Sequence, residues 1–74
     1  MELKVMLKNE KDVQEFVQAA TVCPGAIDLK SGAIYLDAKS LLGVMSMGMK
    51  REMQVLCSNY DPVFVKSVRK FAVA

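Results

Sequence analysis

Residues 37–48 read Asp-Ala-Lys-Ser-Leu-Leu-Gly-Val-Met-Ser-Met-Gly. Ser40 is suited to be an N-cap, because its hydroxyl can accept a hydrogen bond from a backbone amide one turn further on. The segment that follows has room for two helical turns, and Gly48 is suited to end them. The sequence therefore predicts a short helix in the middle of the chain.

This short segment carries more apolar side chains than one helix face can bury. They are Leu41, Leu42, Val44, Met45, Met47 and Met49. A helix that lies on one side of a sheet cannot turn every face inward. The i, i+3 spacing of Val44 and Met47 predicts that these two side chains face the sheet. Leu41, Leu42 and Met45 then remain as an exposed apolar patch, which suggests a docking site.

The segment before the short helix has the pattern of a β-hairpin. Residues 26–30 and 33–37 flank Ser31-Gly32, a dipeptide suited to a two-residue turn. Pairing Lys30 with Ala33 brings four aliphatic side chains onto one face of the hairpin. These side chains are Ile27, Leu29, Ile34 and Leu36. The pattern therefore predicts a hairpin with one buried face.

Two further strands are predicted by period-2 alternation at the start of the chain and after the short helix. Their buried positions are expected to be Leu3, Val5 and Leu7 in the first strand and Met53, Val55 and Cys57 in the other.

A longer helix follows each of these two strands. Asn9 can cap the first helix, and Pro24-Gly25 can end it. Asp61 can cap the last helix, with Pro62 at its first helical position. Apolar residues at helical spacing define the buried stripes. The stripes are Val13, Phe16, Val17 and Ala20 in the first helix, and Phe64, Val65, Val68, Phe71 and Ala72 in the last.

The element order is therefore β-α-β-β-α-β-α, which predicts an α+β fold. We expect a single domain over residues 1–74, with a four-stranded, mainly antiparallel sheet and three helices on one face. A hydrophobic content of 53% and a charged content of 24% favour a packed domain over a disordered chain. A ferredoxin-like βαββαβ domain with an added helix shares this order but pairs its strands differently, so it stays as the alternative fold.

Residues 37–48 resemble the regulatory segment of HPr, the histidine-containing phosphocarrier protein. The family pattern is lysine-serine, two apolar residues, glycine, two apolar residues, serine, apolar, glycine. The element order also fits the HPr fold, an open-faced β-sandwich, and residues 10–20 are similar to the part of the family's first helix that follows its active-site loop. The resemblance covers nearly the whole chain.

The chain departs from HPr at the residue that carries the phosphoryl group. It contains no histidine, and residues 7–12 run almost straight from the first strand into the first helix. Phosphoryl transfer by the family's mechanism needs an imidazole nitrogen as nucleophile. The resemblance therefore implies a non-enzymatic HPr-like protein that lacks the active-site histidine and its loop.

The resemblance also implies a regulatory role for Ser40. In Gram-positive bacteria the matching serine of HPr is phosphorylated by an ATP-dependent HPr kinase. A phosphoserine adds about −1.5 to −2 charge, which at a helix N-terminus meets unpaired amides. The similar apolar patch of HPr contacts enzyme I, the kinase and a catabolite-control transcription factor. The candidate partner-binding residues are accordingly Lys39, Leu41, Leu42 and Met45.

Two functions follow from this interpretation. The first is a regulatory or adaptor domain related to the sugar phosphotransferase system, with a protein partner such as HPr kinase or a transcriptional regulator. The second is a constitutive interaction or assembly domain, a degenerate HPr paralogue without phosphorylation. We expect a monomer or a weak homodimer.

The sequence offers no other functional site. Cys23 and Cys57 are isolated and have no histidine partners, so we expect no metal, no cofactor and no cysteine nucleophile. Asp28 and Asp37 are expected at opposite ends of the hairpin, and therefore not as an acid–base pair. We expect no catalytic residues.

Charge and hydropathy exclude two further classes of partner. The formal net charge is +2 and the basic residues are mostly scattered, so nucleic-acid binding is not expected. The N-terminus lacks the apolar core of a signal peptide, and no apolar run approaches the length of a membrane span. We expect a cytoplasmic protein that does not bind membranes.

Overall fold

The computed structural model describes residues 3–73, and its element order is the predicted βαββαβα. The strands are β1 (Leu3–Met6), β2 (Ile27–Ser31), β3 (Ile34–Asp37) and β4 (Glu52–Cys57). The helices are α1 (Glu10–Thr21), α2 (Leu41–Met47) and α3 (Pro62–Val68), and a 3₁₀ turn, η1 (Arg69–Phe71), continues α3.

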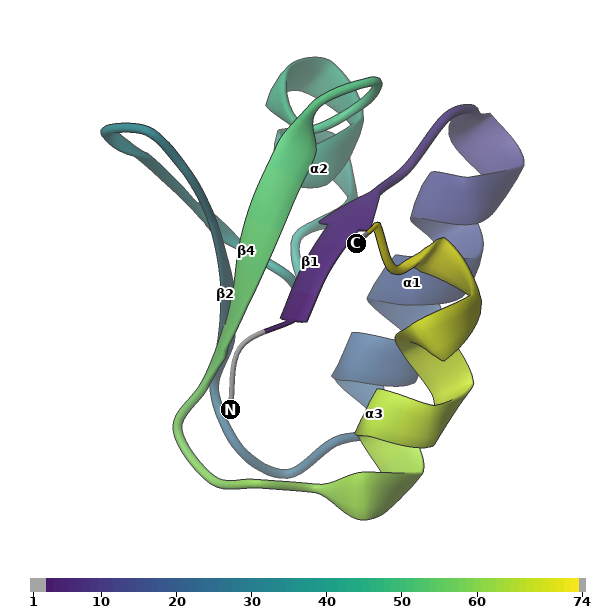
Figure 1. Cartoon of the computed structure of the whole chain (residues 1–74), viewed down its shortest axis with the longest axis vertical. Coiled ribbons are helices and arrows are strands. Elements are labelled where there is room, and N and C mark those ends of the chain that lie inside the picture. Colours follow the sequence, from purple (N-terminus) through teal and green to yellow (C-terminus); the bar gives the residue numbers. More distant parts are fainter. Residues whose placement is uncertain (1–2, 74) are drawn as a thin grey trace.

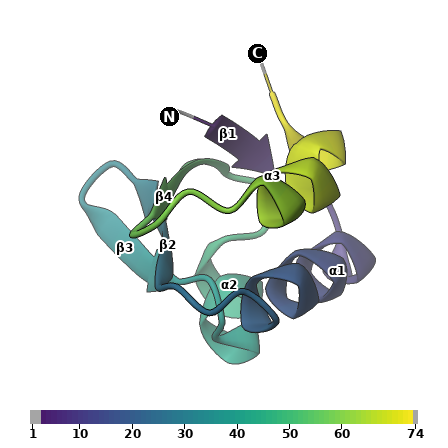
Figure 2. The ribbon, with the colours of Figure 1, turned by 90° about the horizontal axis from the view of Figure 1, so that it is seen from below.

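The four strands form one sheet in the order β1-β4-β2-β3, and all neighbouring strands are antiparallel. The last strand therefore lies between β1 and β2 (Figure 1). In a ferredoxin-like domain the third strand takes that place, so the alternative fold is wrong. The three helices lie on one face of the sheet, and the other face is open (Figure 2). The predicted α+β architecture is confirmed.

The first and last helices, α1 and α3, begin at the predicted caps. The Asn9 side chain accepts a hydrogen bond from the Asp12 amide at 2.9 Å. The Asp61 carboxylate accepts from the amides of Val63 and Phe64 at 3.0 and 3.3 Å. Each cap satisfies amides that a helix start leaves unpaired, so local sequence fixes where these helices begin.

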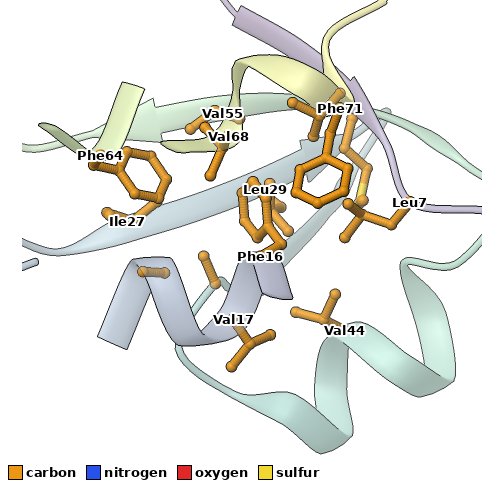
Figure 3. Close-up of a cluster of buried hydrophobic side chains, with 14 of the residues drawn as sticks. Leu7, Phe16, Val17, Ile27, Leu29, Val44, Val55, Phe64, Val68 and Phe71 are labelled. Atoms are coloured by element: carbon orange, nitrogen blue, oxygen red, sulfur yellow. The ribbon is translucent and has the colours of Figure 1, made fainter. Parts of the chain in front are cut away.

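The core lies between the sheet and the helical layer, and the predicted helix stripes together with the predicted buried strand positions supply most of it. Phe16 of α1 is at its centre and meets Phe64 and Phe71 edge to face, with ring centroids 5.8 and 6.2 Å apart (Figure 3). The predicted stripe residues of the first and last helices are buried, apart from Ala72.

Ala72 was assigned to the last helix, and this assignment is wrong. It is exposed and extended, and it bridges Val5 on the edge of β1 that faces away from β4. Val73 donates its amide to the Lys4 carbonyl at 2.8 Å. The chain leaves the helix here because the free edge of β1 offers backbone groups that need partners.

The hairpin of β2 and β3 turns one residue later than predicted. Ser31 pairs with Ile34, so the loop is Gly32-Ala33, and the predicted pairing of Lys30 with Ala33 is wrong. Gly32 has a φ of 61°, whereas Ala33 is not in the positive-φ region. This is the pattern of a type II′ turn, which places glycine at the first central position.

The change of register moves each cross-strand partner by two residues. Leu29 lies opposite Leu36 instead of Ile34, and both side chains stay on the core face. Asp28 and Asp37 lie directly opposite each other, so the expectation that they sit at opposite ends of the hairpin is wrong. Both carboxylates are exposed.

Candidate protein-binding surface

The short helix α2 starts where the sequence predicts. Ser40 has extended φ and ψ angles, and its Oγ accepts a hydrogen bond from the Gly43 amide at 3.3 Å. The turn before it is fixed by Asp37, whose carbonyl accepts from the Ser40 amide and whose carboxylate accepts from the Lys39 amide. Ser40 is therefore a cap on a defined turn, and it is exposed to solvent.

The face of α2 that meets the core is the row of Val44 and Gly48. Val44 is fully buried and points into the cluster from below (Figure 3). Gly48 is also buried, and a Cβ at this position would lie 3.2 Å from the Met53 sulfur of β4. The missing side chain lets the end of α2 approach the sheet closely.

Outside the row of Val44 and Gly48, the surface of α2 is apolar and open to solvent. Leu42 is 83% exposed, Met47 46% and Leu41 40%. We call these three side chains the α2 patch. At 100° per residue, Leu41 and Met47 lie on the two flanks of the Val44 row and Leu42 lies opposite it, so the exposed apolar surface extends around the helix.

Two predictions about this face are wrong. Met47, expected to face the sheet, is exposed, and Met45, expected in the patch, is half-buried against the core. The reason is that the inward row runs from Val44 to Gly48, at i, i+4, and not from Val44 to Met47. At 100° per residue, Met45 and Met47 fall on the two sides of this row, and only the side of Met45 meets the core.

Lys39 was a candidate for partner binding, and its charged group has a partner within the chain. Its Nζ donates to the Cys23 carbonyl at 2.7 Å, which ties the start of α2 to the loop after α1. The side chain is half-buried, and its ammonium is directed at this loop. A role of Lys39 in binding a partner stays a prediction.

Cys23 also joins this loop to the start of α3. Its thiol donates to the Asp61 carboxylate at 3.3 Å. This hydrogen bond, together with the Phe64 amide, holds the pKa of Asp61 below its ordinary value, because both donors favour the charged carboxylate. The cluster is a structural link between two connections of the fold.

Cys57 is a poor nucleophile in this structure. Its pKa is raised, chiefly because partial burial disfavours the thiolate, and also because Cys23 and Asp61 lie near it. A thiol with a raised pKa is protonated at neutral pH and reacts slowly. Neither cysteine forms a disulfide.

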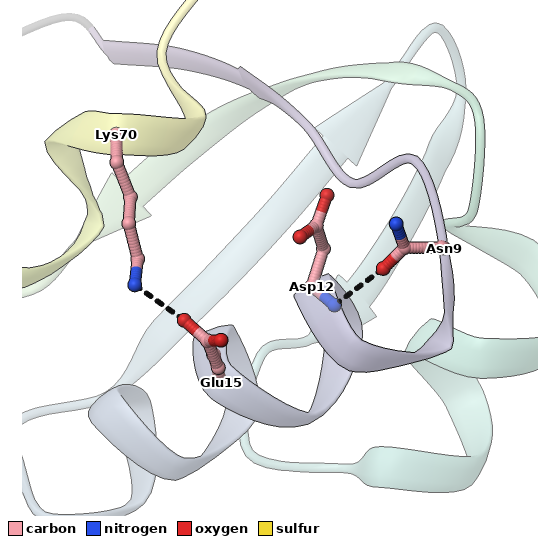
Figure 4. Close-up of polar contacts among 4 residues, drawn as sticks. All are labelled: Asn9, Asp12, Glu15 and Lys70. Carbon is pink, nitrogen blue, oxygen red and sulfur yellow. Dashed lines mark hydrogen bonds and ion pairs between the residues drawn. The ribbon is translucent and has the colours of Figure 1, made fainter.

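A hollow of about 310 Å³ lies between the start of α1 and η1, beside the end of β1. Its charged lining consists of Lys8, Lys11, Asp12, Glu15 and Lys70. Lys70 donates to the Glu15 carboxylate across this hollow (Figure 4) and thereby lowers the pKa of Glu15. The charged groups are mixed in sign, and none of them is a nucleophile poised beside a base.

The connection from β1 to α1 is very short. Leu7, Lys8 and Asn9 alone separate the two elements. No imidazole is available in this connection, since the chain contains no histidine. The chemistry of a phosphohistidine carrier is therefore absent from this position.

Two negative findings apply to the part of the chain that the structure describes. Within residues 3–73, no three side chains of histidine, cysteine, aspartate or glutamate come together as a metal site would require. No helix in that range combines the length and the apolar character needed to cross a bilayer.

Sequence reasoning missed Met47 as a member of the exposed face. The available signal was Gly48, because a glycine at i+4 from Val44 permits the close approach that marks the inward row. The links from Cys23 to Lys39 and Asp61 had no sequence signal, since they join residues 16 and 38 positions apart.

Comparison with known proteins supports the fold. No protein-family model matches the chain, and no curated protein matches it. Among solved structures, the crystal structure of HPr-C-His from Thermoanaerobacter tengcongensis is similar with a TM-score of 0.74. The match has 20% sequence identity and covers 95% of this chain and 88% of that chain. The fold of this chain is therefore that of HPr.

Proposed function

We propose that this chain is a cytoplasmic, non-catalytic regulatory or adaptor domain related to the sugar phosphotransferase system, and that it binds a protein partner through the α2 patch. The observation that supports the proposal most strongly is the exposure of Leu42, 83% on a helix capped by Ser40. An apolar side chain held in water by a rigid helix loses little conformational entropy when a partner covers it.

The carrier role is not part of the proposal. A carrier needs a nucleophile that accepts and returns a phosphoryl group, and the short connection of Leu7, Lys8 and Asn9 offers none. An HPr-like domain without this nucleophile can still bind other proteins through its surface, and binding is therefore the proposed function.

Phosphorylation of Ser40 is the proposed control. A kinase would transfer the γ-phosphoryl group of ATP to the exposed Oγ, breaking the bond to ADP and releasing the hydroxyl proton to a base of the kinase. The phosphate oxygens would lie where Oγ accepts from the Gly43 amide, so the cap would be kept. The added charge would lie beside Leu41 and Leu42 and alter docking there.

The test is incubation with an HPr kinase and ATP, followed by mass spectrometry of the intact protein. We expect one phosphate on the wild type and none on Ser40→Ala. Ser46→Ala is the matched control, because Ser46 is a second exposed hydroxyl of α2, bonded to the Leu42 carbonyl. Equal incorporation in wild type and Ser40→Ala, or none in either, would remove the proposed control.

The second candidate is a constitutive interaction or assembly domain. The exposure of Leu42 is the observation that favours it, because an exposed apolar side chain can bind a partner without any modification. In this case binding would be the same in wild type and Ser40→Ala and would be lost in Leu42→Lys.

A further inference from the structure

α2 is fastened to the rest of the chain by few contacts. Val44 is the one side chain of this seven-residue helix that is buried. At the end of the helix, the Lys50 amide donates to the Leu7 carbonyl at 2.7 Å. An element with few buried apolar contacts opens locally at a low cost in free energy. Each further bond to α2 therefore accounts for a large share of its local stability.

The start of α2 is fastened by Lys39. Its side-chain Nζ donates to the Cys23 carbonyl at 2.7 Å, and its backbone amide donates to the Asp37 carboxylate at 2.9 Å. Both the side chain and the backbone of the residue directly before Ser40 are thus held in place. The position of the Ser40 cap therefore depends on the contacts of Lys39.

The end of α1 is a favourable place for the Lys39 ammonium. The C-terminal end of a helix carries partial negative charge, which a nearby cation stabilises. The last turn of α1 contains no basic residue, and Cys23 follows its C-cap Val22 directly. Lys39 therefore brings to this end the positive charge that α1 itself does not supply. Its side chain is half-buried, so water and salt screen the contact less than they screen a surface pair.

We infer that Lys39 is a positioning residue, which fixes the start of α2 through its bond to the end of α1 and thereby orients Ser40 and the α2 patch. It does so without contacting the partner itself. Removal of the ammonium leaves α2 fastened at its end and at Val44 alone, so the start of the helix opens more often. The inference rests on the proposed role of α2 in binding.

Amide hydrogen exchange of the full chain, followed by NMR, tests the inference on Lys39→Met, which removes the ammonium and keeps an apolar stem. The amides of Val44 and Gly48 donate to carbonyls of Ser40 and Val44, so their exchange reports the opening of α2. We expect both to exchange roughly five- to tenfold faster than in the wild type. The amides of β4, inside the sheet, report unfolding of the whole chain and should change less.

Two variants serve as controls. Lys39→Arg keeps a charged donor and should exchange like the wild type. Lys66→Met makes the same change at an exposed lysine of α3 and should leave the exchange of α2 unaltered. Wild-type exchange of α2 in Lys39→Met would overturn the inference, and so would an equal rise in α2 and β4, which would mean a general loss of stability.

The exchange measurement needs neither a kinase nor a partner, so its outcome is separate from that of the proposed function. Faster exchange confined to α2 supports the inference even where an HPr kinase labels no residue. Where the kinase labels Ser40, labelling should be slower in Lys39→Met than in Lys39→Arg. Slow labelling of Lys39→Met combined with wild-type exchange of α2 would assign Lys39 to direct contact with the kinase and overturn the inference.

Discussion

Lys50 has a φ of 61° and is the one non-glycine residue in the left-handed region among residues 3–73. It follows α2, and its amide donates to the Leu7 carbonyl at 2.7 Å, which holds the chain in this conformation. Left-handed backbone costs a residue with a side chain about 1–2 kcal/mol. Glycine avoids this cost but loses more freedom on folding, about 0.5–1 kcal/mol.

Lys50→Gly should therefore raise the free energy of unfolding by about 0.5–1 kcal/mol, measured by urea denaturation. Arg51→Gly is the matched control, since Arg51 is the next residue and is not in the left-handed region. It should lower stability by about 0.5–1 kcal/mol. A loss of stability in both variants would show that Lys50 is not strained.

Asp61 gives the stability of the chain a dependence on pH. Hydrogen bonds from the Cys23 thiol and the Phe64 amide hold its pKa below the ordinary value of 3.8. A carboxylate with a lowered pKa contributes stability that is complete above the unfolded pKa and is lost as the pH falls through the folded one. The loss therefore occurs below pH 3.8.

Asp61→Asn keeps an oxygen that can cap α3, but it does not titrate. The advantage of wild type over Asp61→Asn in unfolding free energy should shrink as the pH falls below 3.8. Denaturant titrations at a series of pH values measure this difference. A difference that stays constant or grows toward acid pH would contradict the role given to the carboxylate.

Single residues also show why part of the candidate site could not be predicted. The cap role of Ser40 was predictable because a cap bonds to an amide three residues on. The contact of Lys39 with Cys23 depends on how two distant segments pack, and no local pattern records it. The position of Lys39, the charged residue of the predicted surface, could therefore not be predicted from the local sequence.

At the scale of elements, the close approach of α2 to the sheet depends on Gly48. A Cβ at this position would lie 2.9 Å from the Val44 carbonyl oxygen and 3.2 Å from the Met53 sulfur. The backbone oxygen cannot move without distorting α2. Gly48→Ala should therefore lower the free energy of unfolding by about 1–3 kcal/mol, measured by thermal or urea denaturation.

Gly43→Ala is the control within the same helix. A Cβ at Gly43 would meet only the Ser40 side chain, at 3.2 Å to Oγ. Alanine is a better helix former than glycine by about 0.8–1 kcal/mol. Gly43→Ala should leave stability unchanged or raise it, and an effect as large as that of Gly48→Ala would show that close packing at Gly48 is not the cause.

The elements were predicted well where the pattern was local and redundant. The stripe of α1 has four apolar residues at helical spacing and is bounded by a cap and by Pro24-Gly25, so the sequence allowed only one choice of buried face. For the hairpin, the sequence allowed two registers. A shift of two residues keeps Leu29 and its aliphatic partners on the same face, and only the backbone of Gly32 distinguishes the two pairings.

The orientation of α2 had the same kind of ambiguity. A seven-residue helix with apolar side chains on most of its faces has no polar stripe to mark the solvent side. The contacts of Gly48 with β4 settle the orientation, and they belong to the tertiary structure. For this reason the prediction placed Met47 toward the sheet and Met45 in the solvent, which is the reverse of their positions in the structure.

At the scale of the whole molecule, the order of elements constrains the fold strongly. Helices with apolar surface must cover a sheet whose strands each have one apolar face, and short connections favour neighbours in space. The strand order β1-β4-β2-β3 was not set by this pattern alone, since a ferredoxin-like sheet satisfies it too. The resemblance to HPr is what favoured the HPr sheet over the ferredoxin-like sheet.

The proposed function requires α2 to present apolar side chains to water. Oxidation of methionines by dilute hydrogen peroxide tests it directly, at a protein concentration low enough to avoid association, with peptide mass spectrometry as the readout. Met47 is 46% exposed, Met45 is half-buried and Met53 is 1% exposed. We expect Met47 to oxidise fastest of the three and Met53 slowest. Oxidation of Met47 as slow as that of Met53 would show that α2 is covered and would contradict its proposed role in binding.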